Sequence, residues 1–259
     1  MKNSKKIGLA LGSGGARGFA HVGVIKVLEE NNIKIDCIAG SSIGAVVGGL
    51  YATHQDIKEL EEMVSTTDWT RFISLLDPSF KNGLLHGEKA MRFIESYIGK
   101  IHFSDTRIPF AVVATDYKTG DPVVLRNGLV SLAIRASMSV PLAFKPFEHD
   151  GKLLVDGGMS LPVPVTTVRE MEADIVIAVN LDGGYFANST DDAGYAEMAF
   201  RSLNMLRYNL AGQIVKDADV VVTPEVGHVL WYNFVTGKEC LKAGEKAMVE
   251  MLPKLKRLL

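Results

Sequence analysis

The chain has 259 residues, of which 47% are hydrophobic, enough to bury the core of one large α/β domain. Its formal net charge is −2, with 28 basic and 30 acidic side chains spread along the sequence, so we expect no nucleic-acid partner. No run reaches the roughly 18 uncharged apolar residues that cross a bilayer, so we expect no transmembrane segment.

The cysteines and the N-terminus indicate the compartment. The two cysteines, Cys37 and Cys240, suggest neither a disulfide framework nor a cysteine metal site. The apolar run after Lys5-Lys6 stops at Gly12, which is too short for the apolar region of a signal peptide. We therefore expect a cytoplasmic protein whose membrane contact, if it makes any, is peripheral and at the inner face. The sequence is compatible with a homo-oligomer.

The first fifty residues alternate between strand and helix, which predicts a parallel sheet. In chain order we expect a strand at 5–11, a glycine-rich loop at 12–18, a helix at 19–31, a strand at 33–39, a tight turn at 40–44 and a buried helix at 43–53. The pattern changes at 56–100, where short amphipathic helical segments are broken at Asp77-Pro78 and Asn82-Gly83. We interpret this stretch as a helical cap or lid.

Strand patterns return after residue 107, and they extend the α/β alternation to the end of the chain. We expect strands at 108–115, 121–125, 152–155, 174–181 and 218–223, helices at 128–137, 195–216 and 239–259, and a Gly/Ser/Asp-rich loop at 184–194. No internal repeat or linker interrupts the order. The prediction is a single α/β domain over residues 1–259.

The pentapeptide Gly40-Ser41-Ser42-Ile43-Gly44 lies between a buried strand and a buried helix. Flanking glycines let such a turn be tight enough to expose the central serine hydroxyl. The following helix directs its amide groups and positive dipole end at the same place. Ser42 is therefore a candidate nucleophile with Ser41 as a small neighbour, and a purely structural bend is the alternative.

A serine nucleophile needs donors for the oxyanion that forms when it attacks a carbonyl. The loop Gly12-Ser13-Gly14-Gly15-Ala16-Arg17-Gly18 follows the neighbouring strand, so we expect it beside Ser42 at the carboxyl end of the sheet. The backbone amides of Gly14 and Gly15 are the candidate donors. Arg17 either adds positive charge or braces the loop.

A dinucleotide-binding protein that uses residues 12–18 is a competing hypothesis, because that fingerprint shares the order strand, glycines, helix. Two features count against it. Arg17 stands where the third glycine belongs, and the second strand ends in GSSIG instead of an acidic residue for a ribose. A phosphate-binding P-loop is weaker still, since Gly-Lys-Ser/Thr is missing.

The serine also needs a base. In an α/β-hydrolase, His228 is the one histidine after Asp156 that could serve, but a nucleophile after the second strand is early for that fold. Asp156 can act as the base directly, because burial in a dry site raises a carboxyl pKa toward neutrality. It ends an apolar strand, and Gly157-Gly158 let the backbone turn without crowding the serine. Alone, Asp-Gly-Gly is an ordinary turn, and only its conjunction with Ser42 and the glycine loop indicates catalysis.

The three motifs GSGGARG, GSSIG and DGG, in this order, resemble those of the patatin-like phospholipase family, and ASMSVPLAFKP at 136–146 is similar to the family's segment before the Asp strand. Arrangement and length most resemble the bacterial RssA-like patatins of the neuropathy-target-esterase group. The resemblance implies a three-layer α/β fold with a mostly parallel central sheet and a small helical cap. It also implies a Ser-Asp dyad without histidine, and neither metal nor cofactor.

Carried over position by position, the resemblance makes Ser42 the nucleophile, Asp156 the base, and Gly14 and Gly15 with Arg17 the oxyanion loop. The supporting glycines are Gly12, Gly18, Gly40, Gly44, Gly157 and Gly158. Ser13 stands where the family has the first of three glycines, which puts the outer donor in doubt. The implied activity is hydrolysis of lipid carboxyl esters, of phospholipase or lysophospholipase type, through an acyl-enzyme. A non-catalytic regulatory protein on a hydrolase fold is a further alternative.

Three other features have ordinary interpretations beside functional ones. His21 is more typical of a histidine that packs a helix or braces a loop than of a catalytic group. The aromatic stretch 228–234 either enters a lipid interface or packs on the domain edge. The basic segment 254–259 either binds an anionic membrane or complements the dipole of the last helix.

Overall fold

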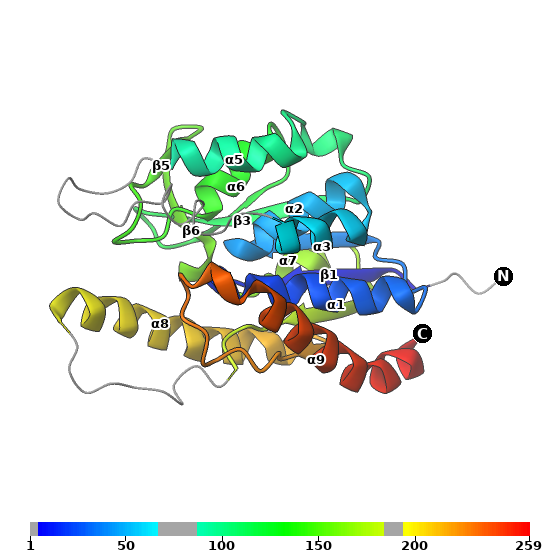
Figure 1. Cartoon of the computed structure of the whole chain (residues 1–259). Coiled ribbons are helices and arrows are strands. Elements are labelled where there is room, and N and C mark those ends of the chain that lie inside the picture. Colours follow the sequence, from blue (N-terminus) through cyan, green and yellow to red (C-terminus); the bar gives the residue numbers. More distant parts are fainter. Residues whose placement is uncertain (1–4, 67–86, 184–193) are drawn as a thin grey trace.

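The computed structural model describes residues 5–66, 87–183 and 194–259 (Figure 1). The expected breaks at Asp77-Pro78 and Asn82-Gly83, and nearly all of the expected loop 184–194, lie outside the described residues. Within them, eight strands form one sheet in the order β5-β6-β3-β2-β1-β7-β8, with β4 also paired to β3. The strands are β1 (Ile7–Leu11), β2 (Cys37–Ser41), β3 (Phe110–Asp116), β4 (Pro122–Leu125), β5 (Phe147–His149), β6 (Lys152–Asp156), β7 (Ile175–Val179) and β8 (Val220–Val222).

The strand directions confirm a mostly parallel sheet. Strands β3, β2, β1, β7 and β8 run parallel, whereas β4 and β6 are antiparallel to β3 and β5 is antiparallel to β6. The register matters for function. Ser41 lies opposite Val113 of β3, and the next residue of β3, Ala114, lies opposite Asp156 of β6. Because β4 pairs with residues 112–115 along the opposite edge of β3, β2 and β6 lie end to end along one edge, and the end of β6 comes next to Ser41.

Helices cover both faces of the sheet, so the predicted three-layer fold is confirmed (Figure 1). Leu9 and Leu11 face a core that includes side chains of α1, α2 and α9, whereas Ala10 faces a smaller core that includes α7 and the end of α8. The helices are α1 (Phe19–Glu30), α2 (Ile43–His54), α3 (Ile57–Thr66), α5 (Glu88–Ile98), α6 (Val130–Ser137), α7 (Val165–Glu170), α8 (Tyr195–Ile214) and α9 (Gly237–Leu258). No helix in the described ranges has the length and apolar character needed to span a bilayer.

The region expected to form a cap is helical wherever the structure describes it. Helix α3 contacts α1, α2 and α9, and α5 contacts α2 and α6. Their buried side chains, among them Leu60 and Ile94, belong to the same core cluster as the sheet. These two helices therefore extend the layer of α1 and α2.

Several boundaries differ from those expected. The strand expected at 33–39 begins only at Cys37 and runs on to Ser41, directly into the turn. Ile33 and Ile35 are buried nonetheless, because their side chains pack into the core from the connecting segment. Strand β5 and helix α7 were not expected, since three and six residues are too few to show a period.

Candidate active site

The turn between β2 and α2 holds Ser42 in a strained conformation. Its φ of 55° and ψ of −121° lie outside the regions that L-residues normally occupy. A Cβ on Gly44 would lie 2.1 Å from the carbonyl oxygen of Leu11, so the turn packs this closely only with glycine there. The amide of Ser42 donates to Ser137 Oγ at 2.8 Å, and Ser137 Oγ donates to the Val113 carbonyl at 2.5 Å. Ser137 thus ties the turn to β3.

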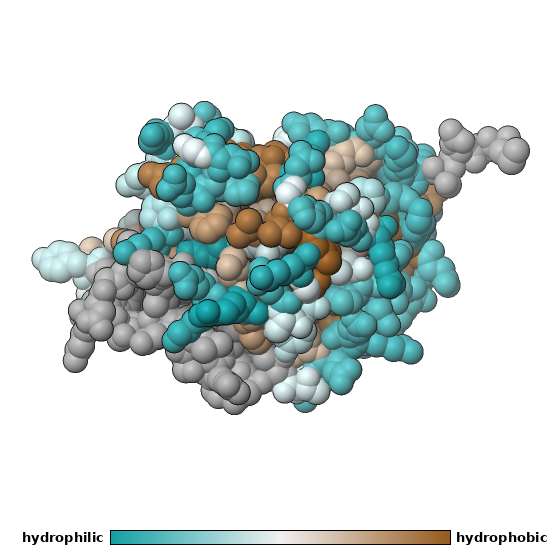
Figure 2. Space-filling model, turned by 90° about the horizontal axis from the view of Figure 1, so that it is seen from above, coloured by the Kyte–Doolittle hydropathy of each residue, from teal (hydrophilic) through white to brown (hydrophobic). Residues whose placement is uncertain are grey.

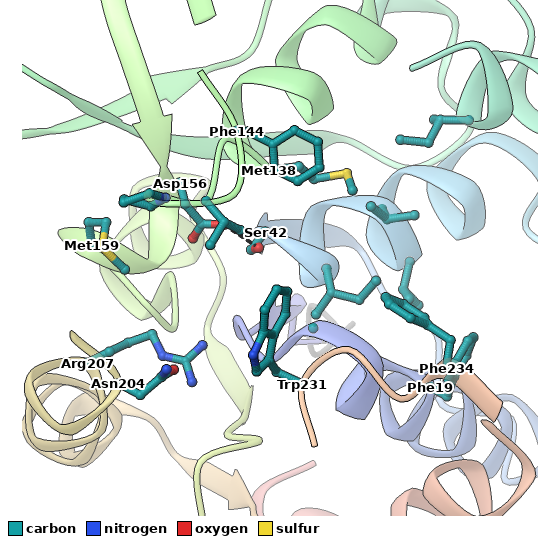
Figure 3. A pocket seen from close by; sticks show the side chains of 18 of the residues that line it. Phe19, Ser42, Met138, Phe144, Asp156, Met159, Asn204, Arg207, Trp231 and Phe234 are labelled. Atoms are coloured by element: carbon teal, nitrogen blue, oxygen red, sulfur yellow. Dashed lines mark hydrogen bonds between the residues drawn. The ribbon is translucent and has the colours of Figure 1, made fainter. Parts of the chain in front are cut away.

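Ser42 and Asp156 meet directly (Figure 3). Ser42 Oγ donates to Asp156 Oδ2 at 2.5 Å, and Asp156 Oδ1 accepts from the Gly158 amide at 2.7 Å. Burial raises the pKa of Asp156 to about 6, against the hydrogen bonds from Ser42 and Gly158 and the positive charge of Arg207, which favour the ionised form. A carboxyl group that titrates near neutrality and contacts a hydroxyl is placed to act as a general base.

The backbone amides of the glycine loop fall into two groups. The amides of Gly12, Ser13 and Ala16 donate to the carbonyls of Val179, Pro162 and Trp231. Those of Gly14 and Gly15 have no acceptor among the described residues, and both glycines line the same pocket as Ser42. Gly15 has φ of 59°, and a Cβ there would lie 2.3 Å from the Trp231 carbonyl oxygen. The backbone amide of Ser13 already donates to the Pro162 carbonyl, so it is not available as a third oxyanion donor, whichever side chain stands at position 13.

Arg17 and His21 support the loop from behind. The Arg17 side chain is fully buried and donates to the carbonyls of Gly14 and Leu181, at 3.1 and 3.2 Å. It does not line the pocket, so of its two expected roles its contacts favour bracing. His21 Nε2 hydrogen-bonds the Gly12 carbonyl at 2.8 Å, and burial lowers the pKa of His21 to about 4. A neutral His21 therefore donates this bond and also braces the loop.

The other sequence candidates lie away from the dyad. His228 Nε2 is 2.5 Å from Glu239 Oε1, its side chain is half exposed, and it does not line the pocket. The alternative with His228 as base is therefore unsupported. In the last helix, Leu255 is buried and Lys256 donates to Asn31 Oδ1 at 2.9 Å, so part of the basic C-terminal segment packs on the domain. In the described part of the chain, no group of three His, Cys, Asp or Glu side chains is arranged to hold a metal ion.

An apolar pocket with a cavity volume of about 110 Å³ opens beside the dyad. Besides Ser42, Asp156, Gly14 and Gly15, its lining consists of Phe19, Ile43, Val46, Val47, Leu50, Met63, Phe93, Ile94, Tyr97, Met138, Val140, Pro141, Phe144, Met159, Phe200, Leu203, Asn204, Arg207, Trp231 and Phe234. Among these described residues, Asp156 and Arg207 are the charged ones. Asn204 and Arg207 were not expected at the site, since a helical period does not reveal which face of α8 meets a pocket.

The chain belongs to the patatin-like phospholipase family, whose model matches residues 9–169. That range contains the glycine loop, the Ser42 turn and Asp156-Gly157-Gly158. The match confirms the resemblance deduced from the three motifs.

Relatives extend the comparison to the neuropathy-target-esterase (NTE) group. The chain is 41% identical over 182 residues to an uncharacterized NTE family protein of Mycobacterium bovis, covering 70% of this chain and 50% of that protein. It is 34% identical over 185 residues to Lysophospholipase NTE1 of Pyricularia oryzae, covering 68% and 12%. The chain thus spans half or less of the length of these relatives.

Among solved structures, VipD from Legionella pneumophila is similar, with a TM-score of 0.67 and 12% sequence identity. The similarity covers 96% of this chain and 66% of VipD. At this identity it supports the fold alone.

Proposed function

We propose that this protein is a serine acyl hydrolase that cleaves lipid carboxyl esters, of phospholipase or lysophospholipase type, with Ser42 as nucleophile and Asp156 as base. The observation that carries the proposal is the 2.5 Å hydrogen bond between Ser42 Oγ and Asp156 Oδ2 at the wall of an apolar pocket. Family membership and relatives named lysophospholipase support the same substrate class.

The mechanism follows from the contacts. Asp156 takes the proton of Ser42 Oγ as this oxygen attacks the ester carbonyl, and the amides of Gly14 and Gly15 bind the resulting oxyanion. The intermediate collapses to an acyl-enzyme while Asp156 returns the proton to the departing alkoxide. Asp156 then takes a proton from a water molecule that attacks the carbonyl of the acyl-enzyme, and it returns this proton to Ser42 Oγ as the bond to the acyl group breaks and the fatty acid leaves. Because Asp156 must be ionised and its pKa is about 6, kcat/KM is expected to fall below about pH 6.

The alternatives have less support. Nucleotide binding by residues 12–18 needs free loop amides, and three of them already bind carbonyls within the chain. A non-catalytic regulatory protein would keep the same dyad geometry and turn over no ester, and its cellular function would survive Ser42→Ala. Assays on esters separate that hypothesis from the proposed one.

Contact with a lipid surface is part of this proposal. Leu230, Tyr232 and Val235 are each at least half exposed, and they flank Trp231 and Phe234, which line the pocket. Apolar side chains on that rim would let a lipid pass from a membrane toward Ser42. Figure 2 shows an apolar band in the middle of one face, framed by hydrophilic side chains. We propose that the protein works in the cytoplasm and visits the inner membrane face.

The decisive experiment labels the nucleophile. We expect purified protein to hydrolyse p-nitrophenyl butyrate and lysophosphatidylcholine, and to carry one fluorophosphonate adduct on Ser42 by peptide mass spectrometry. Ser42→Ala is expected to lose both turnover and label, whereas Ser41→Ala, which removes the neighbouring hydroxyl of the same turn, is expected to keep the label. Turnover or labelling that persists in Ser42→Ala would end the proposal.

A further inference from the structure

One wall of the pocket comes from α8 and carries two polar side chains beside two apolar ones. Phe200, Leu203, Asn204 and Arg207 follow the spacing i, i+3, i+4 and i+7, so they share the face of α8 that meets the pocket. Figure 3 shows Arg207 and Asn204 on one side of Ser42, with Phe19 and Phe234 on the other. A substrate whose ester lies at Ser42 thus has an apolar wall on one side and a guanidinium on the other.

Arg207 is buried with spare hydrogen-bonding capacity. Its side chain is 9% exposed, and Nη2 donates to Asp182 Oδ1 at 2.7 Å. Its Nε is buried without a partner among the described residues. A buried guanidinium group left partly unsatisfied is costly, and such groups are retained where a ligand completes them.

Arg207 shares its carboxylate partner with a second arginine. Asp182 Oδ1 also lies 3.5 Å from Arg17 Nη1, so two buried guanidinium groups share one carboxylate. Asp156 is the other charged residue of the pocket lining, and among the described residues no ion pair within 4.0 Å joins it to Arg207. When Asp156 takes up a proton in the acylation step, Arg207 is the one charged side chain among the described residues that line the pocket.

We propose that Arg207, with Asn204 beside it, forms a subsite for the phosphate of a lipid headgroup. This inference rests on the proposed function and names its substrate: a phospholipid or lysophospholipid whose acyl chain lies on the apolar side and whose phosphodiester lies against α8. Guanidinium groups bind phosphate oxygens through charge-assisted hydrogen bonds, which are about twice as strong as neutral ones. Asn204 can contribute an amide donor or acceptor at the next turn of the helix.

The test measures binding in the absence of turnover, so it stays informative even if Ser42 is not a nucleophile. Ser42→Ala protein is titrated calorimetrically with decylphosphocholine, which has a phosphodiester and no acyl ester, and with decylglycerol, which is neutral, both below the micelle threshold. Adding Arg207→Met is expected to weaken decylphosphocholine at least tenfold and to change decylglycerol less than twofold. Arg201→Met, on the same helix but outside the pocket lining, is the matched control and is expected to change neither.

Further arms make each outcome decisive. Equal weakening of both ligands, or none, would overturn the inference. So would decanoate binding more tightly than decylphosphocholine with the same dependence on Arg207, because the subsite would then serve the fatty-acid product. If Arg207→Met does not fold, Arg207→Lys is tested in its place, because lysine keeps the positive charge. This variant is expected to keep a preference for decylphosphocholine over decylglycerol, and loss of that preference would also overturn the inference. In active protein, Arg207→Met should raise KM for lysophosphatidylcholine more than KM for monoacylglycerol. A fall in kcat on both substrates would instead make Arg207 a group that acts through Asp156.

Discussion

Residues 9–169 and residues 170–259 build the same pocket with different kinds of residues. The first part, which matches the family model, contributes the dyad, the two glycine amides and a long apolar wall. The second part contributes Phe200, Leu203, Asn204, Arg207, Trp231 and Phe234, none of which touches the Ser42–Asp156 hydrogen bond. The proposed division of labour is that the first part performs the chemistry on any ester, while the second selects which ester enters. Changes in the two parts should therefore differ in how their effects depend on the substrate.

The largest effect is expected in the first part. Asp156→Asn removes the proposed base, so kcat should fall at least 10³-fold on short-chain esters and on lysophospholipid alike. The purified variant, assayed on both substrates near pH 8, checks this. A loss confined to one substrate would break the comparison, because Asp156 would then act in selection.

A change in the second part should depend on the substrate. Leu203→Trp adds bulk to the pocket wall, so we expect kcat/KM to fall about 10- to 100-fold on lysophosphatidylcholine and to change little on p-nitrophenyl acetate. Leu206→Trp is the matched control, since Leu206 lies on the same helix, is 68% exposed and does not line the pocket. Equal losses on both substrates would contradict the division between the two parts.

The same two parts differ in what the sequence reveals. Ser42, Asp156, Gly14 and Gly15 were predictable because their chemistry needs specific residue types in tight turns after strands, and glycine marks such turns. The helix that carries Leu203 and Arg207 was also predicted, within two residues at its end. Its pocket-facing side was not, because a period of 3.6 shows that a helix has faces and does not show what each face meets. The one signal that could have indicated Arg207 is its pairing with an acidic residue. That residue, Asp182, is 25 positions away in the sequence, so no local pattern reveals the pair.

The sequence also predicts the arrangement of the strands only in part. The parallel units β1-α1-β2-α2 follow from alternating apolar runs and connection lengths. The antiparallel entry of β6 beside β3 does not, since a strand's direction depends on long-range pairing. Yet this pairing places Asp156 beside Ser42, because β6 follows β2 along the same edge of β3. The sequence motifs thus predicted that the two residues meet, through the family resemblance, whereas the physical reason became visible only in the register.

A smaller effect on activity is expected from Ser137, a positioning residue in the first part. Ser137→Ala leaves the Ser42 amide without its acceptor inside a strained turn, so we expect about tenfold lower kcat with unchanged KM on every ester. The free energy of unfolding should fall by about 1–3 kcal/mol, since the amide is left unsatisfied in a buried site. Steady-state kinetics on the short and long substrates, with urea unfolding, provide the test. If Ser137→Ala instead raises only the KM for lysophospholipid, Ser137 contributes to substrate selection and does not position Ser42.

The smallest net effect concerns stability between about pH 4 and 6, where two buried groups act in opposite directions. The folded pKa of Asp156 is raised from 3.8 to about 6, so in this range the folded state holds a proton that the unfolded state lacks. Its contribution to stability is fully present below pH 3.8 and is lost as pH rises through 6, by about 3 kcal/mol. The folded pKa of His21 is lowered from 6.5 to about 4, so there the unfolded state holds the extra proton. That contribution is fully present above pH 6.5 and is lost as pH falls to 4, again by about 3 kcal/mol.

Each group should therefore mask the other in the wild-type protein, and single variants should reveal them. Relative to wild type, Asp156→Asn is expected to be more stable at pH 7 and to lose that advantage on acidification to pH 4. His21→Gln, which keeps an amide donor for the Gly12 carbonyl, is expected to lose less stability than wild type on the same acidification. Urea unfolding at pH 4, 5, 6 and 7 measures both differences, with the double variant as the control for additivity. If Asp156→Asn is no more stable than wild type at pH 7, burying the Asp156 carboxylate costs no free energy of folding. Its pKa would then not be raised by burial, and this explanation for a base that titrates near neutral pH would be wrong.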